Sequence, residues 1–374
     1  MNYGENEISQ SLIKLGHSVV IVTGNRYFPF PNYSDTVGKI LGSRIQPVGK
    51  STVKGVTILR EKVIAEFAAR ALFFGIQKNI SDFNPDIILV SGTCTPVAVQ
   101  AAYFKPQRTR LICVDSHLPS ELKQGNQLLK SLFYFIFRTF FASLVSQRTD
   151  KFIAVQEATS EVIQETYGIA KLPVVISHGT DMDLFKYSQS ERKKVRKKLR
   201  IPQNAFVIIT TGKIIPAKGV DLLFEAVKLL LKVHSDIYLL VVGDGPIEYK
   251  KKCLRVIPVL KRLKIHMVGF QLQKSLPKFY SSADIAVWPL QESLAMNDAI
   301  SCGIPVIAND NIGVKERFSN GNALLYKQGN VIDLVEKIEY LYEDRDLRMK
   351  MGKRGRALVE RKMSWKRKAK KYIQ

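Results

Sequence analysis

The chain has 374 residues, of which 46% are hydrophobic and 24% are charged, so it has room for about two folded domains, and intrinsic disorder is excluded as its default state. Lysine and arginine together number 57 against 33 aspartate and glutamate residues, which gives a formal net charge of +24. Such a chain should attract a polyanion, whether nucleic acid, an anionic membrane face or a phosphate-bearing substrate.

Cysteine usage and the placement of the basic residues narrow these classes. The four cysteines form no C-x-x-C pair and no histidine cluster stands near them, which argues against structural zinc and is typical of reduced, buried thiols in a cytoplasmic protein. The basic excess is densest in residues 192–198 and 361–371, and each run could be a polyanion-binding surface or a solvated helix face. No nucleic-acid-binding module accompanies the charge, so nucleic acid is not expected as a partner.

The chain opens on a helix pattern rather than on a strand. Residues 1–7 are polar, and the spacing of Ile8, Leu12 and Leu15 predicts a helix before the first strand, at 18–23. A doubly wound α/β domain ordinarily opens with a strand that lies centrally in its sheet. The first domain is therefore expected to lack this strand, either because the start given is internal to the true gene or because the protein is impaired.

Short apolar runs alternate with longer helical patterns along the whole chain. Most of the runs are continuous rather than alternating, which favours strands covered on both faces of a parallel sheet. The predicted strands are 18–23, 86–91, 111–114, 152–155, 173–177, 206–211, 237–242, 265–268, 285–288, 305–308 and 323–326. Strand–helix–strand alternation in both halves predicts two doubly wound, Rossmann-like α/β domains. The basic polar stretch 186–200 is the predicted linker, which gives domains 1–185 and 186–374.

One apolar stretch, residues 128–145, has about the length of a membrane span. Lys130 and Arg138 interrupt it, and a charge near the centre of a span costs at least ~2.5 kcal/mol. We therefore interpret the stretch as a buried or interfacial helix. An interfacial helix in so basic a chain would dock on anionic lipid, while the alternative is that it packs inside the first domain.

The second half carries a glycine and lysine motif between a predicted strand and a helix. It runs from Thr211 to Gly219 and contains Gly212, Lys213 and Lys218. Glycine lets backbone approach a ligand closely, a helix N-terminus attracts anions, and both lysines could reach a diphosphate. The alternative is an ordinary strand–helix turn with exposed lysines. The motif is not a Walker loop.

Two further segments follow strands in the second half. Gly243, Asp244 and Gly245 come directly after an apolar strand, where open α/β sheets bind ligands, although a tight turn before a helix explains them equally well. Glu292 and Asp298 precede a glycine turn, and their carboxylates could accept hydrogen bonds from sugar or ribose hydroxyls or simply cap a helix start.

The order and spacing of these segments resemble the retaining GT-B glycosyltransferases, the glycosyl transferases group 1 family of mannosyl- and glucosyltransferase-like proteins. That family shows G-R-x-x-x-x-K-G, V-G-D-G-P, E-x7-E and A-C-G-x-P-V-I-A in the order found between Thr211 and Ala308. The resemblance extends to residues 16–19 and 177–185 and to the tail around 348–352 and 363–365. It implies two Rossmann-like domains facing across a cleft, with the acceptor in the first domain, the nucleotide sugar in the second, and residues 361–374 packing back on the first.

The resemblance also implies site residues. Lys218 would hold the donor diphosphate, Lys213 stands where the family has arginine, and Asp298 would hold the ribose in place of the second glutamate of E-x7-E. Glu292 is the candidate for the first glutamate, although the spacing here is E-x5-D. Further implied roles are a nucleotide pocket lined by Gly243 to Gly245 beside Gly212, and an active-site histidine at His117, which a structural histidine would equally explain.

The function expected is metal-independent transfer of a hexose from a nucleotide-diphosphate sugar to a glycan or lipid-linked acceptor, with retention and without a separate cofactor. The D-x-D sequence at Asp181 and Asp183 is interpreted as part of the 177–185 element and not as a metal site. A cytoplasmic enzyme of polysaccharide biosynthesis, with peripheral contact to the inner membrane face, would fit these features. The alternatives are a catalytically impaired GT-B protein that binds polyanions or acts as a scaffold, and a sugar-nucleotide epimerase.

Overall fold

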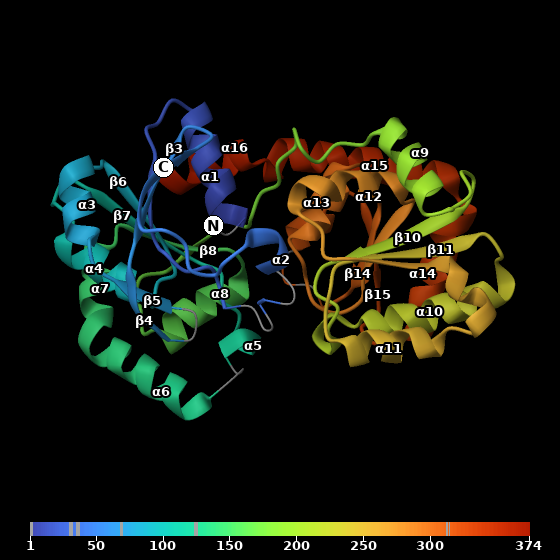
Figure 1. Ribbon diagram of the computed structural model, residues 1–374, viewed down its shortest axis with the longest axis horizontal. Helices are drawn as coiled ribbons and strands as arrows, with labels where there is room; N and C mark the ends of the chain where they lie inside the picture. Colours follow the sequence, from blue (N-terminus) through green and yellow to red (C-terminus); the bar gives the residue numbers. More distant parts are fainter. Residues whose placement is uncertain are drawn as a thin grey trace. The chain divides into compact units, whose positions relative to one another are not determined.

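A computed structural model describes residues 3–29, 33–34, 38–67, 70–122, 126–311, 313 and 315–374, and the chain divides into two compact units (Figure 1). The first comprises residues 1–178 and 365–374, and the second comprises residues 179–364. The sequence predicted a boundary after residue 185. The structure places it after residue 178, because Thr180 pairs with Ser364 and Phe185 is buried in the core of the second unit. Of the basic tail, residues 361–364 belong to the second unit and the rest to the first.

The second unit contains one six-stranded parallel sheet in the order β12-β11-β10-β13-β14-β15. Its strands are β10 (Phe206–Thr211), β11 (Ile237–Val242), β12 (Ile265–Gly269), β13 (Ile285–Trp288), β14 (Val306–Asn309) and β15 (Ala323–Tyr326). Every residue of β10 is buried, as a central strand covered on both faces requires. These strands lie within a residue of their predicted positions.

Helices cover both faces of this sheet (Figure 1). Successive residues of β10 point to opposite faces, so Phe206 and Ile208 join one core while Val207 and Ile209 join the other. The first core contains residues of α10 (Val220–Val233), α11 (Ile247–Val256) and α14 (Val331–Glu343). The second contains residues of α9 (Gln189–Lys198), α12 (Leu276–Ser282), α13 (Ala295–Ser301) and α15 (Arg345–Leu358). The unit is therefore a doubly wound α/β domain.

The first unit contains two main sheets. One has the order β1-β3-β2 and consists of β1 (Val20–Gly24), β2 (Gly49–Val53) and β3 (Val56–Glu61). The other is parallel and consists of β6 (Ile87–Ser91), β7 (Arg110–Asp115), β8 (Lys151–Ala154) and β9 (Val174–Val175) in that order. On one face, α1 (Tyr3–Lys14) and α16 (Trp365–Ile373) pack against β7 and β8, and on the other α4 (Pro96–Phe104) and α7 (Ala142–Arg148) do so.

The strand that the sequence indicated as missing would lie between these two sheets. In the second unit β10 is the first strand, lies between β11 and β13, and is connected to β11 by α10. In the first unit α1 leads into β1 in the same way. Within the described ranges, however, β1 pairs only with β3, and β6 only with β7. All residues of β1 are half-buried, in contrast to the buried residues of β10. Among the described residues, no strand joins β1 to β6, so the two sheets of the first unit are separate.

Four strands between residues 49 and 73 were not predicted. They are β2, β3 and the antiparallel hairpin of β4 (Val63–Phe67) and β5 (Arg70–Phe73). β2 is polar and mostly exposed, whereas β4 is apolar apart from Glu66 and is nevertheless mostly exposed. Antiparallel strands with one solvated face give alternating patterns, and a search for continuous apolar runs misses them.

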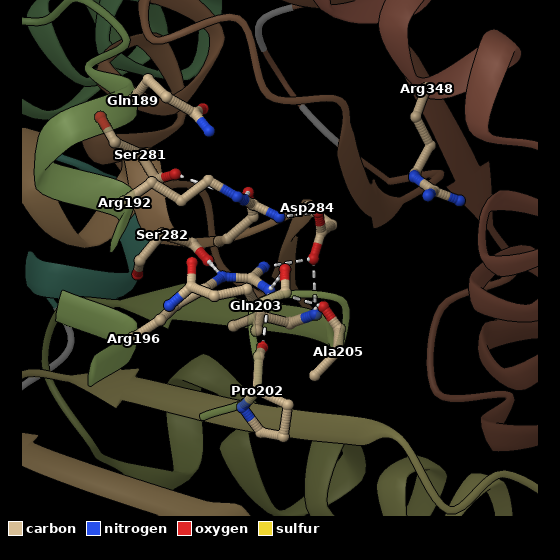
Figure 2. A network of polar contacts seen from close by, with 12 residues as sticks. Gln189, Arg192, Arg196, Pro202, Gln203, Ala205, Ser281, Ser282, Asp284 and Arg348 are labelled. Carbon is tan, nitrogen blue, oxygen red and sulfur yellow. Dashed lines mark hydrogen bonds and ion pairs between the residues drawn. The ribbon is translucent and has the colours of Figure 1, made fainter. Parts of the chain in front are cut away.

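A buried arginine network anchors α9 to the second unit (Figure 2). Arg196 is fully buried, and its guanidinium donates to the Asp284 carboxylate at 2.8 Å and to four backbone carbonyls, those of Ser282, Pro202, Gln203 and Ala205. Arg192 donates to the other carboxylate oxygen of Asp284, also at 2.8 Å. The arginines of the basic run 192–198 are therefore structural. Its lysines are exposed, which is the solvated helix face of the two alternatives.

The apolar stretch 128–145 lies in a continuous helix, residues 127–148, made of α6 (Gln127–Ile136), a π-helical turn (Phe137–Phe141) and α7. Among the described residues it is the one helix long and apolar enough to cross a membrane, judged by length and composition alone. Phe137, Ala142 and Val145 are buried in the core of the first unit. The helix thus packs along the domain on one side and is exposed on the other.

Candidate active site

The loops that follow β10 and β11 are joined backbone to backbone. The Gly212 N–H donates to the Val242 carbonyl at 3.0 Å, and the Ile214 N–H donates to the Asp244 carbonyl at 2.9 Å. A Cβ atom added to Gly243 would lie 1.8 Å from the Gly212 oxygen, and one added to Gly245 would lie 1.9 Å from the Ile214 oxygen. These two glycines are therefore required for the close approach of the loops.

Gly212 has a different role in the same loop. Its φ of 128° favours glycine, yet a Cβ atom added there would meet no atom within 4 Å. The backbone is thus open on this side, where a ligand can approach it. Gly212 lines a pocket together with Lys213, Lys218 and Trp288, at the carboxyl ends of the parallel strands.

The two lysines of the pocket are held differently. Lys213 is exposed, whereas Lys218 is half-buried and its ammonium group donates to the Glu292 carbonyl oxygen at 2.6 Å. Lys218 ends the 3-10 turn Pro216–Lys218, and α10 follows directly after Gly219. The pocket therefore combines two cationic side chains with the positive end of a long helix, an arrangement suited to an anion such as a diphosphate.

Glu292 is engaged through its carboxylate as well. Oε2 accepts a hydrogen bond from the Arg317 guanidinium at 2.7 Å, and Oε1 accepts one from the Gly313 N–H. The Arg317 side chain is almost fully buried. Arg317 therefore fixes the orientation of the Glu292 carboxylate. No sequence signal pointed to Arg317, since it belongs to no motif and contacts Glu292 only in the fold.

Asp298 is held by a residue from another segment of the second unit. It is buried on α13, and its Oδ1 accepts the Thr180 hydroxyl at 2.5 Å. Thr180 is itself fully buried, and its N–H donates to the Met363 carbonyl. Asp298 is thus tied to the segment just after the unit boundary, a contact that sequence reasoning missed.

Asp244 has a local structural role. Its Oδ1 accepts from Lys250 at 2.5 Å and from the Gly245 N–H at 2.8 Å. Burial alone would raise the pKa of Asp244, but these hydrogen bonds outweigh it and the pKa is lowered. The carboxylate is therefore ionised and holds the loop after β11 in shape.

His117 forms a dyad with Asp115 in the first unit. Asp115 ends β7 and is buried, and its Oδ1 accepts from His117 Nδ1 at 2.7 Å and from the His117 N–H at 3.0 Å. Its Oδ2 accepts from the Thr93 N–H at 2.7 Å. Burial raises the pKa of Asp115, yet the hydrogen bonds from His117 and Thr93 outweigh it and lower the pKa. The ionised Asp115 fixes the tautomer with Nδ1 protonated and leaves His117 Nε2 for another partner.

The D-x-D sequence is used within the backbone. Asp181 Oδ1 accepts the N–H groups of Asp183 and Leu184, at 2.9 and 3.1 Å. This is the side-chain-to-backbone pattern of an aspartate that shapes a turn. The pair is therefore part of the segment that begins the second unit.

Two family models match the chain. The model described as glycosyl transferases group 1 matches residues 191–358, and the model described as glycosyltransferase family 4 matches residues 6–184. The first match lies within the second unit. The second covers nearly all of the first unit up to the boundary region.

Curated relatives match over part of their length. The GDP-mannose-dependent monoacylated alpha-(1-6)-phosphatidylinositol monomannoside mannosyltransferase of Corynebacterium glutamicum is 28% identical over 198 residues, 50% of this chain and 51% of that protein. The lipopolysaccharide 1,2-N-acetylglucosaminetransferase of Salmonella typhimurium is 29% identical over 199 residues, 50% of this chain and 52% of that protein. The chain thus spans about half the length of these relatives.

Solved structures share the fold over almost the whole chain. HepE from Anabaena, crystallised in complex with UDP, superposes with a TM-score of 0.68 at 18% identity, over 95% of this chain and 98% of that one. A glycosyltransferase from Rickettsia africae gives a TM-score of 0.70 at 20% identity, over 99% of this chain and 92% of that one. Two Rossmann-like units in one chain are therefore a shared architecture.

Proposed function

The chain belongs to the group 1 glycosyltransferases of the GT-B fold, and from this premise we propose that it transfers a hexose from a nucleotide-diphosphate sugar to a hydroxyl of a glycan or lipid-linked acceptor. The observation that carries the proposal is the pocket at the ends of β10 and β11. It is lined by Gly212, Lys213 and Lys218 and lies at the start of α10. The donor is a substrate, and the proposal includes no separate cofactor.

The two lysines and the helix N-terminus would stabilise the leaving diphosphate. Cleavage of the bond to the sugar builds negative charge on the β-phosphate, and fixed positive groups at that point lower the barrier. Lys218 is positioned by its hydrogen bond to Glu292, whereas the exposed Lys213 is free to turn toward a ligand. We propose that these groups act without a metal ion.

The carboxylates and the histidine would orient the substrates. Glu292, held by Arg317, is placed to accept a hydroxyl of the donor sugar, and Asp298 a ribose hydroxyl that shares or replaces the hydrogen bond from Thr180. We propose that His117 Nε2, oriented by Asp115, is a polar contact for a substrate bound to the first unit. Such positioning can supply a large part of a rate enhancement.

The proposal also includes the stereochemistry of transfer, the cellular compartment and contact with the membrane. Retention at the anomeric carbon is supported by the family membership. Buried free cysteines support a reducing, cytoplasmic location, because such thiols persist there. The net charge of +24 supports peripheral contact with the anionic inner face of the membrane, where a lipid-linked acceptor would be presented.

The test is a thermal-shift and hydrolysis panel with UDP-, GDP- and ADP-sugars. One nucleotide should stabilise the protein, and Lys218→Ala should lose that stabilisation. Lys232→Ala is the matched control, because Lys232 is an exposed lysine near the other end of α10. Stabilisation that survives Lys218→Ala would place the donor elsewhere.

Two other outcomes would favour the alternative functions. No response to any nucleotide sugar, together with tight binding of a polyanion, would indicate a non-catalytic GT-B protein, and the split sheet of the first unit is the feature that favours it. Conversion of the sugar at one carbon without an acceptor would indicate an epimerase.

A further inference from the structure

The helix formed by residues 127–148 exposes a continuous apolar stripe. Its members project from α6 and the π-helical turn, and their exposed fractions range from 41 to 84%: Leu128, Leu129, Leu132, Phe135, Ile136 and Phe140. Residues three and four apart share one face of a helix, so these side chains form one surface and not scattered contacts. Figure 1 shows α6 along the outer edge of the first unit.

The opposite side of the same helix is locked into the domain. Phe137 and Val145 are 3% and 0% exposed and belong to the same core as β7 and α4. The ring of Phe133 also lies 5.6 Å from that of Phe67 on β4. A transmembrane orientation of the helix would break these contacts. The helix can therefore only lie along a surface, with its stripe outward.

The charge of the helix indicates which kind of surface it would bind. Between residues 127 and 148 there is no acidic residue, and the cations are Lys130, Arg138 and Arg148. Lys130 and Arg138 also donate to backbone carbonyls at the two ends of the stripe, those of Leu122 and Glu165. An apolar stripe without an acidic residue, in a chain with a net charge of +24, matches a bilayer interface that offers acyl chains beneath anionic headgroups.

We propose that this stripe, residues 128–140, docks the protein on an anionic lipid bilayer, with the helix in the plane of the interface. The docking itself does not depend on the enzymatic activity, but its link to a lipid-linked acceptor rests on the proposed function. Both aromatic and aliphatic members would enter the boundary between headgroups and acyl chains.

The test is co-sedimentation of the full chain with phosphatidylcholine vesicles, with and without phosphatidylglycerol. We expect binding to the anionic vesicles that weakens in high sodium chloride, by about fivefold for each cation whose attraction is screened. The triple variant Leu128→Gln, Leu132→Gln and Phe135→Gln should bind at least ~10-fold more weakly, because three apolar contacts are lost. Its thermal midpoint should stay that of the wild type, since these side chains are exposed.

The chain supplies a matched control in the second unit. Val259, Leu260 and Leu263 are 71 to 90% exposed and are interleaved with lysine and arginine. Their triple substitution to glutamine should leave vesicle binding unchanged. Equal loss in both triple variants, or no binding of wild type to anionic vesicles, would overturn the proposal.

A dimer in solution would also overturn the docking proposal, and nucleotide binding separates that proposal from the enzymatic one. A dimer in solution that the Leu128, Leu132 and Phe135 substitutions abolish, without vesicle binding, would make the stripe an interface between copies of this chain. Nucleotide-induced stabilisation should be intact in the stripe variant. Lost docking with intact nucleotide binding, and the reverse, therefore identify which proposal has failed.

Discussion

Glu292 connects two loops of the candidate site through two different groups. Its carboxylate accepts a hydrogen bond from the Arg317 guanidinium at 2.7 Å, and its backbone carbonyl accepts one from the Lys218 ammonium at 2.6 Å. Because Arg317 is nearly fully buried, it holds the loop between β13 and α13 in place. The position of Lys218 in the pocket therefore depends on a residue that lies far from it in the sequence.

Removing Arg317 should destabilise the second unit and weaken the site. Arg317→Met leaves the Glu292 carboxylate without its cation, and breaking such a pair costs about 3 kcal/mol. Urea unfolding would measure this loss, and Arg317→Lys should recover part of it. In the double variant with Glu292→Gln the added loss should be small, since the unpaired charge is gone. Fully additive effects of the two substitutions would contradict the coupling.

Gly243→Ala should disrupt the backbone contact between the loops that follow β10 and β11. Its Cβ would lie 1.8 Å from the Gly212 oxygen, and its φ of 150° is unfavourable for alanine, so we expect a loss of at least ~3 kcal/mol in unfolding free energy. Gly329→Ala is the control, because Gly329 also has a positive φ but open space around it. That change should cost only about 1 kcal/mol. Similar losses in the two variants would show that conformation and not contact is decisive.

Breaking the arginine network of Figure 2 should strongly destabilise the second unit. Asp284→Asn removes the carboxylate shared by Arg192 and Arg196 and leaves two cations without it, so we expect a loss of roughly 3–5 kcal/mol. Lys193→Met, an exposed neighbour on α9, should change the unfolding free energy by less than about 0.5 kcal/mol. Thermal unfolding of both variants measures the contrast. Equal midpoints would mean that the network contributes nothing net.

Stability should depend on pH through Asp115. Its pKa is lower in the folded chain than the unfolded value of about 3.9, so its contribution is present above that value and is lost as the pH falls through the folded pKa. Unfolding free energy should therefore decline in acid, and less steeply in Asp115→Asn than in the wild type. The nitrogen chemical shifts of His117 should report Nδ1 protonation in the wild type only. Parallel acid profiles for the two proteins would show that Asp115 has no lowered pKa.

The parallel core of both units could be predicted from the sequence, but the antiparallel part could not. β10, β11, β13 and β15 have their predicted bounds because buried parallel strands are continuous apolar runs. β2 is polar and solvated and therefore resembles a loop, and β4 is mostly exposed although its sequence is largely apolar. The observed domain boundary differs from the predicted one because Thr180 and Phe185 make contacts that no local sequence pattern reveals.

The residues of the candidate site also divide into those that could be predicted from the sequence and those that could not. Lys218 and the glycines could be located because strand–loop–helix motifs are local in sequence. Arg317 meets Glu292 across 25 positions, and Thr180 meets Asp298 across 118, so these pairs exist only in the fold. The sequence placed Gly243 and Gly245 in the nucleotide pocket, which stays a prediction, and the structure shows that both glycines allow the close approach of two loops.

Calorimetric titration with UDP, GDP and ADP tests the central claim most directly, that the pocket after β10 holds a nucleoside diphosphate. We predict that one of the three binds the wild type, and that Lys213→Ala and Lys218→Ala each weaken it by about 10-fold or more, since a charge-assisted hydrogen bond contributes roughly 1.5–3 kcal/mol. Lys232→Ala should bind like the wild type. Equal affinity in all four proteins, or no binding by any, would contradict the assignment of this pocket.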